Sequence, residues 1–228
     1  EEYAIESSIL KVAGSECLDF ILDENIQIHG GNGYVKDYPA ERHYRDSRVN
    51  RIFEGTNEIN RLLIPGMLVK RGLKGKLPLV QAAKQLQDEI MSPGQRQEIG
   101  SAPLAAEQAA VSMFKKVGLA MLGLAMQTYG ADLQDEQEVL SFIADVLIDT
   151  YASESVVLRA KRVHDSAGSS AELHIDTARA LVSDAAARIQ AAAQSAVAAM
   201  VDGDTRRTHL AALRRLLKVS PVNTVAIR

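Results

Sequence analysis

Apolar residues recur at helical spacing along most of this chain. Near its start Ile5, Ile9 and Val12 lie three or four positions apart, and later Val139 and Ile143 repeat the spacing. Such spacing places side chains on one face of an α-helix. The alternation of apolar and polar residues that is typical of strands is almost absent. The pattern therefore predicts an all-α protein in which each helix has one buried face.

Interruptions of the pattern divide the first part of the chain into three predicted helices. We expect helices over residues 2–28 and 42–52, and a third that begins after Thr56 and ends near Leu73. The loop between the first two helices is marked by helix-breaking residues, which are Gly30, Gly31, Gly33 and Pro39. Pro65 lies inside the third helix, so a kink or a break is expected there.

Residues 74–103 interrupt the helical pattern repeatedly, and a second helical block follows them. The stretches "KGKLP", "SPG" and "GSAP" predict a linker that contains one short helix, "LVQAAKQLQDEIM". The block beyond predicts an up-and-down bundle, with helices over 103–130, 135–165, 170–201 and 204–219. Its alanine-rich stretch indicates close packing between helices. The predicted domains are residues 1–73, 74–103 and 104–228.

Composition excludes several classes of function. The chain has 228 residues, of which 46% are hydrophobic, so it can bury a sizeable core. The net charge of −3 gives no reason to expect nucleic acid as a partner. The five histidines and the single Cys17 form no ligand-spaced cluster, so no metal site is expected. No apolar run of the length of a membrane span is evident.

Because the chain begins inside a helical pattern and without Met, we expect it to be a C-terminal piece of a longer protein.

The stretch "RIFEGTNEINRLL" holds the strongest candidate for chemistry, Glu54. Phe53 should lower the local dielectric around this carboxylate, which suits a general base. Gly55 lets a ligand approach the backbone closely. Thr56 or Asn57 can cap the helix that follows, and Glu58 then lies in its first turn. A glutamate near a helix N-terminus also commonly just complements the helix dipole, so the residues alone leave both interpretations open.

Two further segments are open to two interpretations each. "GGNG" at residues 30–33 follows a helix and not a strand, so neither the dinucleotide-binding fingerprint nor the P-loop applies. It is either a helix C-cap with a turn or a stretch of bare backbone amides that meets a phosphate or a flat cofactor. The basic cluster "VKRGLKGK" at residues 69–76 is either a solvated helix end or a contact for anionic lipid or phosphate.

Residues 27–64 contain three short motifs in succession, Q-I-x-G-G-x-G, Y-P-x-E-R-x-x-R-D and I-[FY]-E-G-T. In their order and spacing these motifs resemble the C-terminal signature of the flavin-dependent acyl-CoA dehydrogenases. The block beyond, with "VLRAKR", resembles the extra C-terminal domain of the very-long-chain members, their bacterial relatives and an assembly-factor paralogue. The resemblance implies the C-terminal part of the family's four-helix domain, followed by a second helical bundle.

The resemblance also implies roles for individual residues. Glu54 would remove the α-proton of an acyl-CoA while the β-hydrogen leaves as hydride to FAD, and Gly55 would lie against the substrate. One set of residues would contact FAD, the first five of them reaching the FAD of a neighbouring subunit: Gln27, Ile28, His29, Gly30, Gly31, Thr56, Asn57 and Glu58.

The partners and location implied by the resemblance complete the expectations. They are an acyl-CoA substrate, an electron-transfer flavoprotein, a second copy of the chain in a homodimer, and a membrane surface touched by residues 74–103. The location would be the cytoplasm of a bacterium or the mitochondrial matrix, peripheral to the inner membrane. The chain alone is expected to be inactive, because most of the flavin site would come from other domains. Two alternatives stay open: a non-catalytic assembly paralogue that acts through its C-terminal helices, and an acyl-CoA oxidase.

Overall fold

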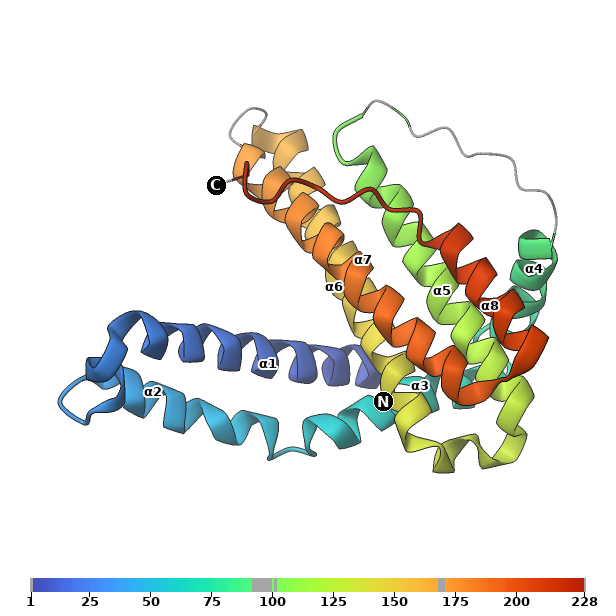
Figure 1. Ribbon diagram of the computed structural model, residues 1–228, viewed down its shortest axis with the longest axis horizontal. Helices are drawn as coiled ribbons and strands as arrows, with labels where there is room; N and C mark the ends of the chain where they lie inside the picture. Colours follow the sequence, from blue (N-terminus) through green and yellow to red (C-terminus); the bar gives the residue numbers. More distant parts are fainter. Residues whose placement is uncertain (1, 92–99, 101, 168–170, 228) are drawn as a thin grey trace. The chain divides into compact units, whose positions relative to one another are not determined.

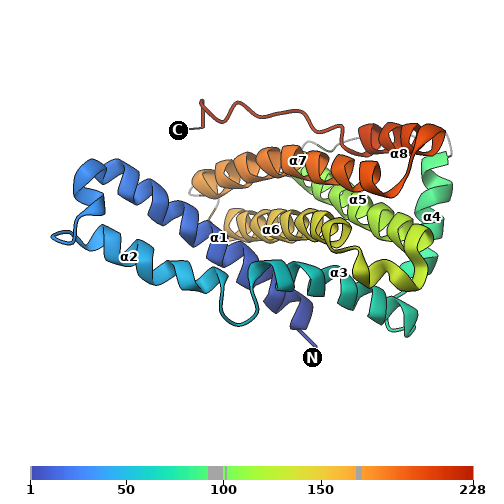
Figure 2. The same ribbon diagram turned by 60° about the horizontal axis from the view of Figure 1, so that its bottom comes forward.

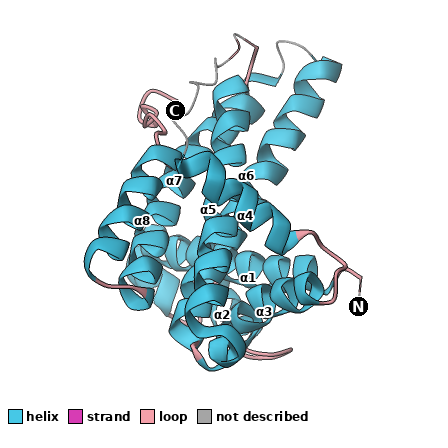
Figure 3. Cartoon of the chain, turned by 90° about the vertical axis from the view of Figure 1, so that its right-hand side faces the viewer, coloured by secondary structure: helices cyan, strands magenta, loops and turns pink. Residues whose placement is uncertain are grey.

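The computed structural model describes residues 2–91, 100, 102–167 and 171–227. Every regular element in these ranges is a helix, which confirms the all-α prediction (Figures 1 and 3). The chain forms two compact units, Glu1–Met67 and Leu68–Arg228. The boundary between these units therefore falls inside the third predicted helix.

The first unit is a pair of helices followed by the start of a third. It contains α1 (Ala4–His29), η1 (Gly30–Tyr34), α2 (Pro39–Arg48), η2 (Val49–Arg51) and the first part of α3 (Asn57–Leu73). α1 and α2 lie side by side and are joined through η1 (Figure 1). α2 begins earlier than predicted because proline fits the first turn of a helix. The predicted loop after α1 contains the short 3₁₀ helix η1.

α3 continues through Pro65, so the predicted break is absent. The proline side chain is fully buried, as is that of its neighbour Ile64. Burial of these apolar groups favours the helix and offsets the backbone hydrogen bond that a proline cannot donate.

The second unit is a helical bundle. It contains α4 (Leu79–Met91), α5 (Ala105–Tyr129), η3 (Gly130–Asp135), α6 (Gln137–Ala167), α7 (Glu172–Met200) and α8 (Gly203–Leu216). α5, α6 and α7 pack on one another along the bundle (Figure 2), and α4 and α8 also contact α5. These bounds confirm the four helices predicted for this block to within a few residues.

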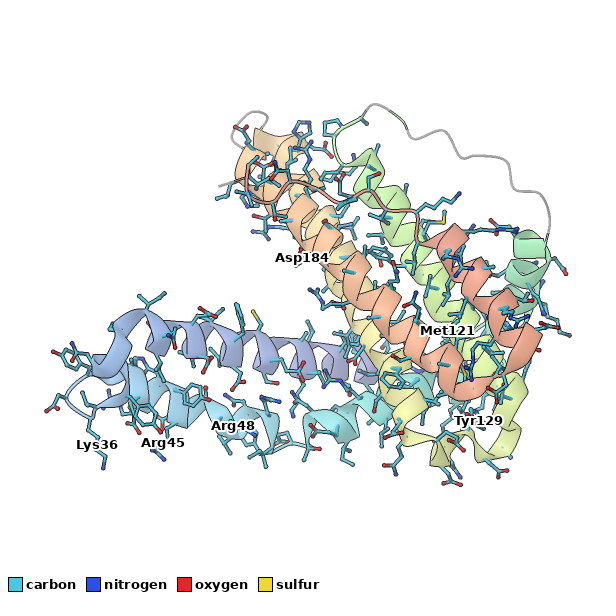
Figure 4. All side chains as sticks on the ribbon, in the orientation of Figure 1. Lys36, Arg45, Arg48, Met121, Tyr129 and Asp184 are labelled. Atoms are coloured by element: carbon cyan, nitrogen blue, oxygen red, sulfur yellow. The ribbon has the colours of Figure 1, made fainter. Side chains whose placement is uncertain are left out.

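The core of the second unit combines large and very small side chains. Met121 of α5, labelled in Figure 4, is almost completely buried, and so are Phe114 of α5 and Ile143 of α6. On α7 the buried face is largely alanine, with Ala185 and Ala193 fully buried. Small side chains let helix backbones approach closely, so the alanine-rich stretch is a packing surface, as predicted from the sequence.

α5 corrects one expectation. Together with η3 it is long and apolar enough to cross a membrane, judged by length and composition only, whereas the sequence suggested no such stretch. Half of its most apolar window is buried inside the unit, and α5 contacts α4, α6, α7 and α8. Its position at the centre of the bundle accounts for its apolar composition.

The predicted linker is in part a packed element. α4 has the expected bounds, but its Leu86 is 4% exposed and the helix packs on α5. Glu89 of α4 also pairs with Lys116 of α5. This segment therefore belongs to the second unit, because the apolar face of α4 needs a partner to leave water. The stretches 92–99 and 101 of the predicted linker lie outside the described residues.

Candidate active site

Glu54 lies on a turn between η2 and α3 that has an uncommon backbone conformation. Its φ is 56° and that of Gly55 is 74°. Glycine adopts such angles freely, whereas a residue with a side chain rarely does. The preceding turn is closed by the N–H groups of Ile52 and Phe53, which donate to the Val49 carbonyl at 2.8 and 3.1 Å. The motif predicted from sequence is therefore a sharply bent, hydrogen-bonded turn.

The start of α3 is capped as one of the sequence alternatives predicted. The Thr56 hydroxyl oxygen accepts from the N–H of Ile59 at 3.2 Å. Glu58 follows in the first turn, where its own backbone N–H and then the Thr56 hydroxyl donate to its carboxylate. These hydrogen bonds, with the charges of Arg61 and Arg51, hold the pKa of Glu58 below its ordinary value.

Two side chains hold the carbonyl groups of the turn. The Gly55 carbonyl accepts from Lys11 Nζ at 2.7 Å and from Asn60 Nδ2 at 2.9 Å. Asn60 Nδ2 also lies 3.1 Å from the Thr56 carbonyl and 3.4 Å from that of Glu54. Sequence reasoning missed both Lys11 and Asn60. The only hint in the sequence was that asparagine is a poor helix former inside an otherwise good helix.

Asn57 is turned into the first unit and is fully buried. Its amide nitrogen donates to Ser15 Oγ at 2.9 Å and to Glu16 Oε1 at 3.1 Å, while its oxygen accepts from Lys11 Nζ at 2.7 Å. These contacts anchor the turn to α1. The sequence suggested Asn57 as an FAD contact, but the burial leaves its side chain inaccessible to a ligand in this chain.

An ion pair completes this anchor. Arg61 of α3 makes two hydrogen bonds to the carboxylate of Glu16 on α1, at 2.7 and 2.9 Å. Burial raises the pKa of Glu16, but Arg61, Asn57 and Arg51 outweigh that effect and lower the pKa below its ordinary value. A two-pronged contact of this kind fixes orientation as well as distance.

The carboxylate and the N–H of Glu54 are both available to a ligand. The side chain is exposed, and among the described residues neither its carboxylate nor its backbone N–H has a hydrogen-bond partner. Phe53 is 50% exposed. The expectation that Phe53 would shield the carboxylate is therefore not met within this chain, because the ring does not leave water.

The predicted cofactor segment lies elsewhere on the first unit. Gln27, Ile28, His29, Gly30 and Gly31 are all exposed at the C-terminal end of α1. The Gly30 N–H, with φ at 58°, closes the helix by donating to the Gln27 carbonyl. The segment is thus a helix C-cap and an exposed backbone surface at once. From Ser15, which contacts Asn57, to Gln27 is roughly 18 Å along α1 at the helical rise per residue.

Across the described parts of the chain, no group of three or more His, Cys, Asp or Glu side chains is placed to hold a metal ion. The exposed Glu54 carboxylate, beside an N–H that has no acceptor among the described residues, suits proton abstraction next to a carbonyl.

Comparison with known proteins identifies the family. Residues 1–67 and 113–215 each match a family described as the acyl-CoA dehydrogenase C-terminal domain. The chain is 46% identical over 225 residues to a probable acyl-CoA dehydrogenase of Bacillus subtilis (strain 168), covering 98% of this chain and 38% of that protein. The chain belongs to the acyl-CoA dehydrogenase family. This membership makes it part of an oxidoreductase family and confirms the resemblance drawn from the sequence.

A solved structure supports the same family membership. The crystal structure of an acyl-CoA dehydrogenase complexed with FAD from Bacillus anthracis matches with a TM-score of 0.96 and 44% identity, covering 99% of this chain and 38% of that one. The mitochondrial short-chain specific acyl-CoA dehydrogenase of Bos taurus is 52% identical over 65 residues, 28% of this chain and 16% of that protein. The chain thus spans 38% of the length of the Bacillus proteins.

Proposed function

We propose that this chain supplies the catalytic base, Glu54, of an FAD-dependent long-chain acyl-CoA dehydrogenase. The observation that carries the proposal is the turn itself. It presents an exposed carboxylate and an N–H that has no acceptor among the described residues, and hydrogen bonds from Lys11 and Asn60 fix the turn. Family membership supports this assignment.

The chemistry requires both groups. An α-proton next to a thioester is a weak acid, so the carbonyl must be polarised as the proton departs. In our proposal the Glu54 N–H donates to the thioester oxygen and the Glu54 carboxylate accepts the α-proton. Gly55 has no side chain to obstruct the thioester. Bound FAD would accept the β-hydrogen as hydride.

The chain's own residues fit a part of an FAD site. Gln27, Ile28 and His29 are exposed. Apart from the adjoining backbone, no heavy atom of the described residues lies within 4 Å of the place a Cβ would take at Gly30 or Gly31, so ligand and backbone can approach closely. Their distance along α1 from the Glu54 turn supports a contact with the FAD of a second copy in a homodimer. Thr56 and Glu58 would contact the same FAD as Glu54. We assign Asn57 an indirect role, through the turn it anchors.

The surface of the first unit supports a larger assembly. Its exposed apolar side chains need a cover in water. They include Leu10, Phe20, Ile21, Ile28, Tyr34, Ile52, Phe53 and Ile59. The remaining domains of the protein and a second subunit would provide that cover, and would also surround the Phe53–Glu54 pair.

The length of the acyl group, the electron acceptor and the membrane contact are the finer parts of the proposal. A preference for long acyl groups is supported by the second helical bundle, since the short-chain specific relative matches this protein over only 65 residues. A peripheral membrane contact is supported by exposed Lys74 and Lys76 close to exposed Leu73 and Val80. An electron-transfer flavoprotein would reoxidise the flavin, in the cytoplasm of a bacterium or in a mitochondrial matrix.

The visible spectrum of the complete protein tests this proposal. Anaerobic addition of palmitoyl-CoA should bleach the flavin band, butyryl-CoA should bleach it more slowly, and coenzyme A alone should leave it unchanged. A protein without flavin, or with flavin that no acyl-CoA bleaches, would contradict the proposal. That second outcome would favour the assembly paralogue, whereas hydrogen peroxide formed under air at the rate of turnover would favour an oxidase.

A further inference from the structure

The Gly55 carbonyl of the Glu54 turn is held by side chains from two different helices. It accepts from Lys11 on α1 at 2.7 Å and from Asn60 on α3 at 2.9 Å. Lys11 comes from 44 positions earlier in the chain. One hydrogen bond to a carbonyl suffices for pairing. A second donor from another helix adds orientation, because the two bonds fix the peptide plane from two directions.

The turn needs such support because its backbone is strained. Glu54 has a φ of 56°, in the left-handed region that a residue with a Cβ avoids. A residue in that region persists only when its surroundings over-determine it. Without donors on the carbonyls that follow, Glu54 would relax to a right-handed or extended conformation. Its carboxylate and its N–H would then point elsewhere.

The two donors are themselves held in place. Lys11 Nζ lies 2.7 Å from the oxygen of fully buried Asn57, whose amide group is bonded to Ser15 and Glu16 of α1. Asn60 is 8% exposed and spans three successive carbonyls of the turn. Neither side chain reaches the exposed carboxylate of Glu54. Their contacts with the turn are with its backbone carbonyls.

We propose that Lys11 and Asn60 are positioning residues that clamp the Gly55 carbonyl and thereby aim the carboxylate and N–H of Glu54 at the acyl-CoA. This inference rests on the proposed function. It adds residues that the sequence motif does not contain. Loss of either donor should leave FAD and acyl-CoA binding in place and slow the proton abstraction, since misplacing a reacting group by about 1 Å can cost on the order of 100-fold in rate.

The test uses the complete FAD-loaded protein under anaerobic rapid mixing with palmitoyl-CoA. Lys11→Met removes one donor, Asn60→Ala removes the other, and Lys11→Arg restores a cationic donor at position 11. Lys36→Met is the matched control, because Lys36 extends into solvent from the loop before α2 (Figure 4). The limiting rate of bleaching per bound FAD, the half-saturating acyl-CoA concentration and the unfolding temperature are measured for each.

We expect limiting rates about 10- to 100-fold lower than wild type in Lys11→Met and Asn60→Ala. The half-saturating acyl-CoA concentration should stay within about twofold of the wild-type value, and Lys11→Arg should recover most of the rate. A merely structural role would lower the unfolding temperature or the FAD content and leave the rate per bound FAD unchanged, and that result overturns the inference. If Asn60→Ala fails to fold, the two Lys11 variants decide alone. A wild type that does not bleach overturns the proposed function, and the clamp with it.

Discussion

Glu54 has a left-handed backbone although a side chain there costs roughly 1–2 kcal/mol. Glycine follows it directly, also at positive φ, so the chain makes two unusual bends in succession. At the scale of the residue, the site is therefore defined by backbone conformation as much as by the carboxylate. A glycine at position 54 would satisfy the turn but would remove the proposed base. Retaining a glutamate there is consistent with function.

A second glycine is required for a different reason. Gly33 is buried, and a Cβ at this position would lie 2.6 Å from the Ile26 carbonyl oxygen and 3.0 Å from His29 Cβ. The Ile26 backbone is part of α1 and cannot move without disturbing that helix. Gly14, in contrast, has no heavy atom within 4 Å of its Cβ position.

We predict that Gly33→Ala lowers the free energy of unfolding by about 1–3 kcal/mol, the usual cost of overpacking. Gly14→Ala is the control, and it should leave stability unchanged or slightly raised because alanine favours the helix. Thermal unfolding followed by circular dichroism measures both. Equal unfolding temperatures for the wild type and Gly33→Ala would show that the turn at Gly33 can relax.

The residues of the site differ in whether a local sequence motif or long-range packing places them there. Glu54, Gly55 and Thr56 of the proposed site were assigned from a local motif and from helix capping, and the structure confirms that Thr56 caps α3. Lys11 was not predictable, because its contact with the turn depends on how α1 packs, across 44 positions of sequence. Asn57 was assigned to the cofactor from its place in the motif, but the same packing buries it.

At the scale of the element, the helices were predictable from apolar spacing alone. α5, α6 and α7 each bury one face against the others, and periodicity reports such a face directly. The exceptions are local. Pro65 favoured a break on steric grounds, yet its burial in α3 offsets the lost hydrogen bond. The helix α4 was expected within a linker, but its packing on α5 is a tertiary contact that periodicity cannot reveal.

α8 forms one wall of an apolar cavity. The cavity measures about 210 Å³ and is lined by α4, α5 and α8, with His209 among its lining residues. Burial lowers the pKa of His209 below its ordinary value of 6.5. As pH falls through 6.5, the unfolded chain binds a proton before the folded chain does, so protonation favours unfolding and stability falls toward the lowered pKa.

We predict that the unfolding temperature of the wild type falls more between about pH 7.5 and pH 5.5 than that of His209→Gln, which cannot titrate at this position. The difference between the two proteins isolates this residue from the other groups that titrate in the range. Parallel pH profiles for the two proteins would mean that His209 takes up its proton equally in the folded and unfolded chains.

At the scale of the whole molecule, the two compact units present different surfaces. Most of the large apolar side chains exposed in the described chain belong to residues 1–67, whereas the second unit buries its apolar faces within its own bundle. A unit with exposed apolar faces is suited to contact other domains, subunits or ligands. This contrast accords with the proposed division, in which the first unit holds the chemistry.

The most direct test of the account is the response of the flavin to acyl-CoA after Glu54→Gln in the complete protein. Glu138→Gln is the control, because Glu138 is an exposed glutamate at the start of α6. We predict that Glu54→Gln retains the FAD absorbance, binds palmitoyl-CoA and shows no anaerobic bleaching, whereas the control bleaches at the wild-type rate. Bleaching of Glu54→Gln at the wild-type rate would contradict the assignment of Glu54 as the base.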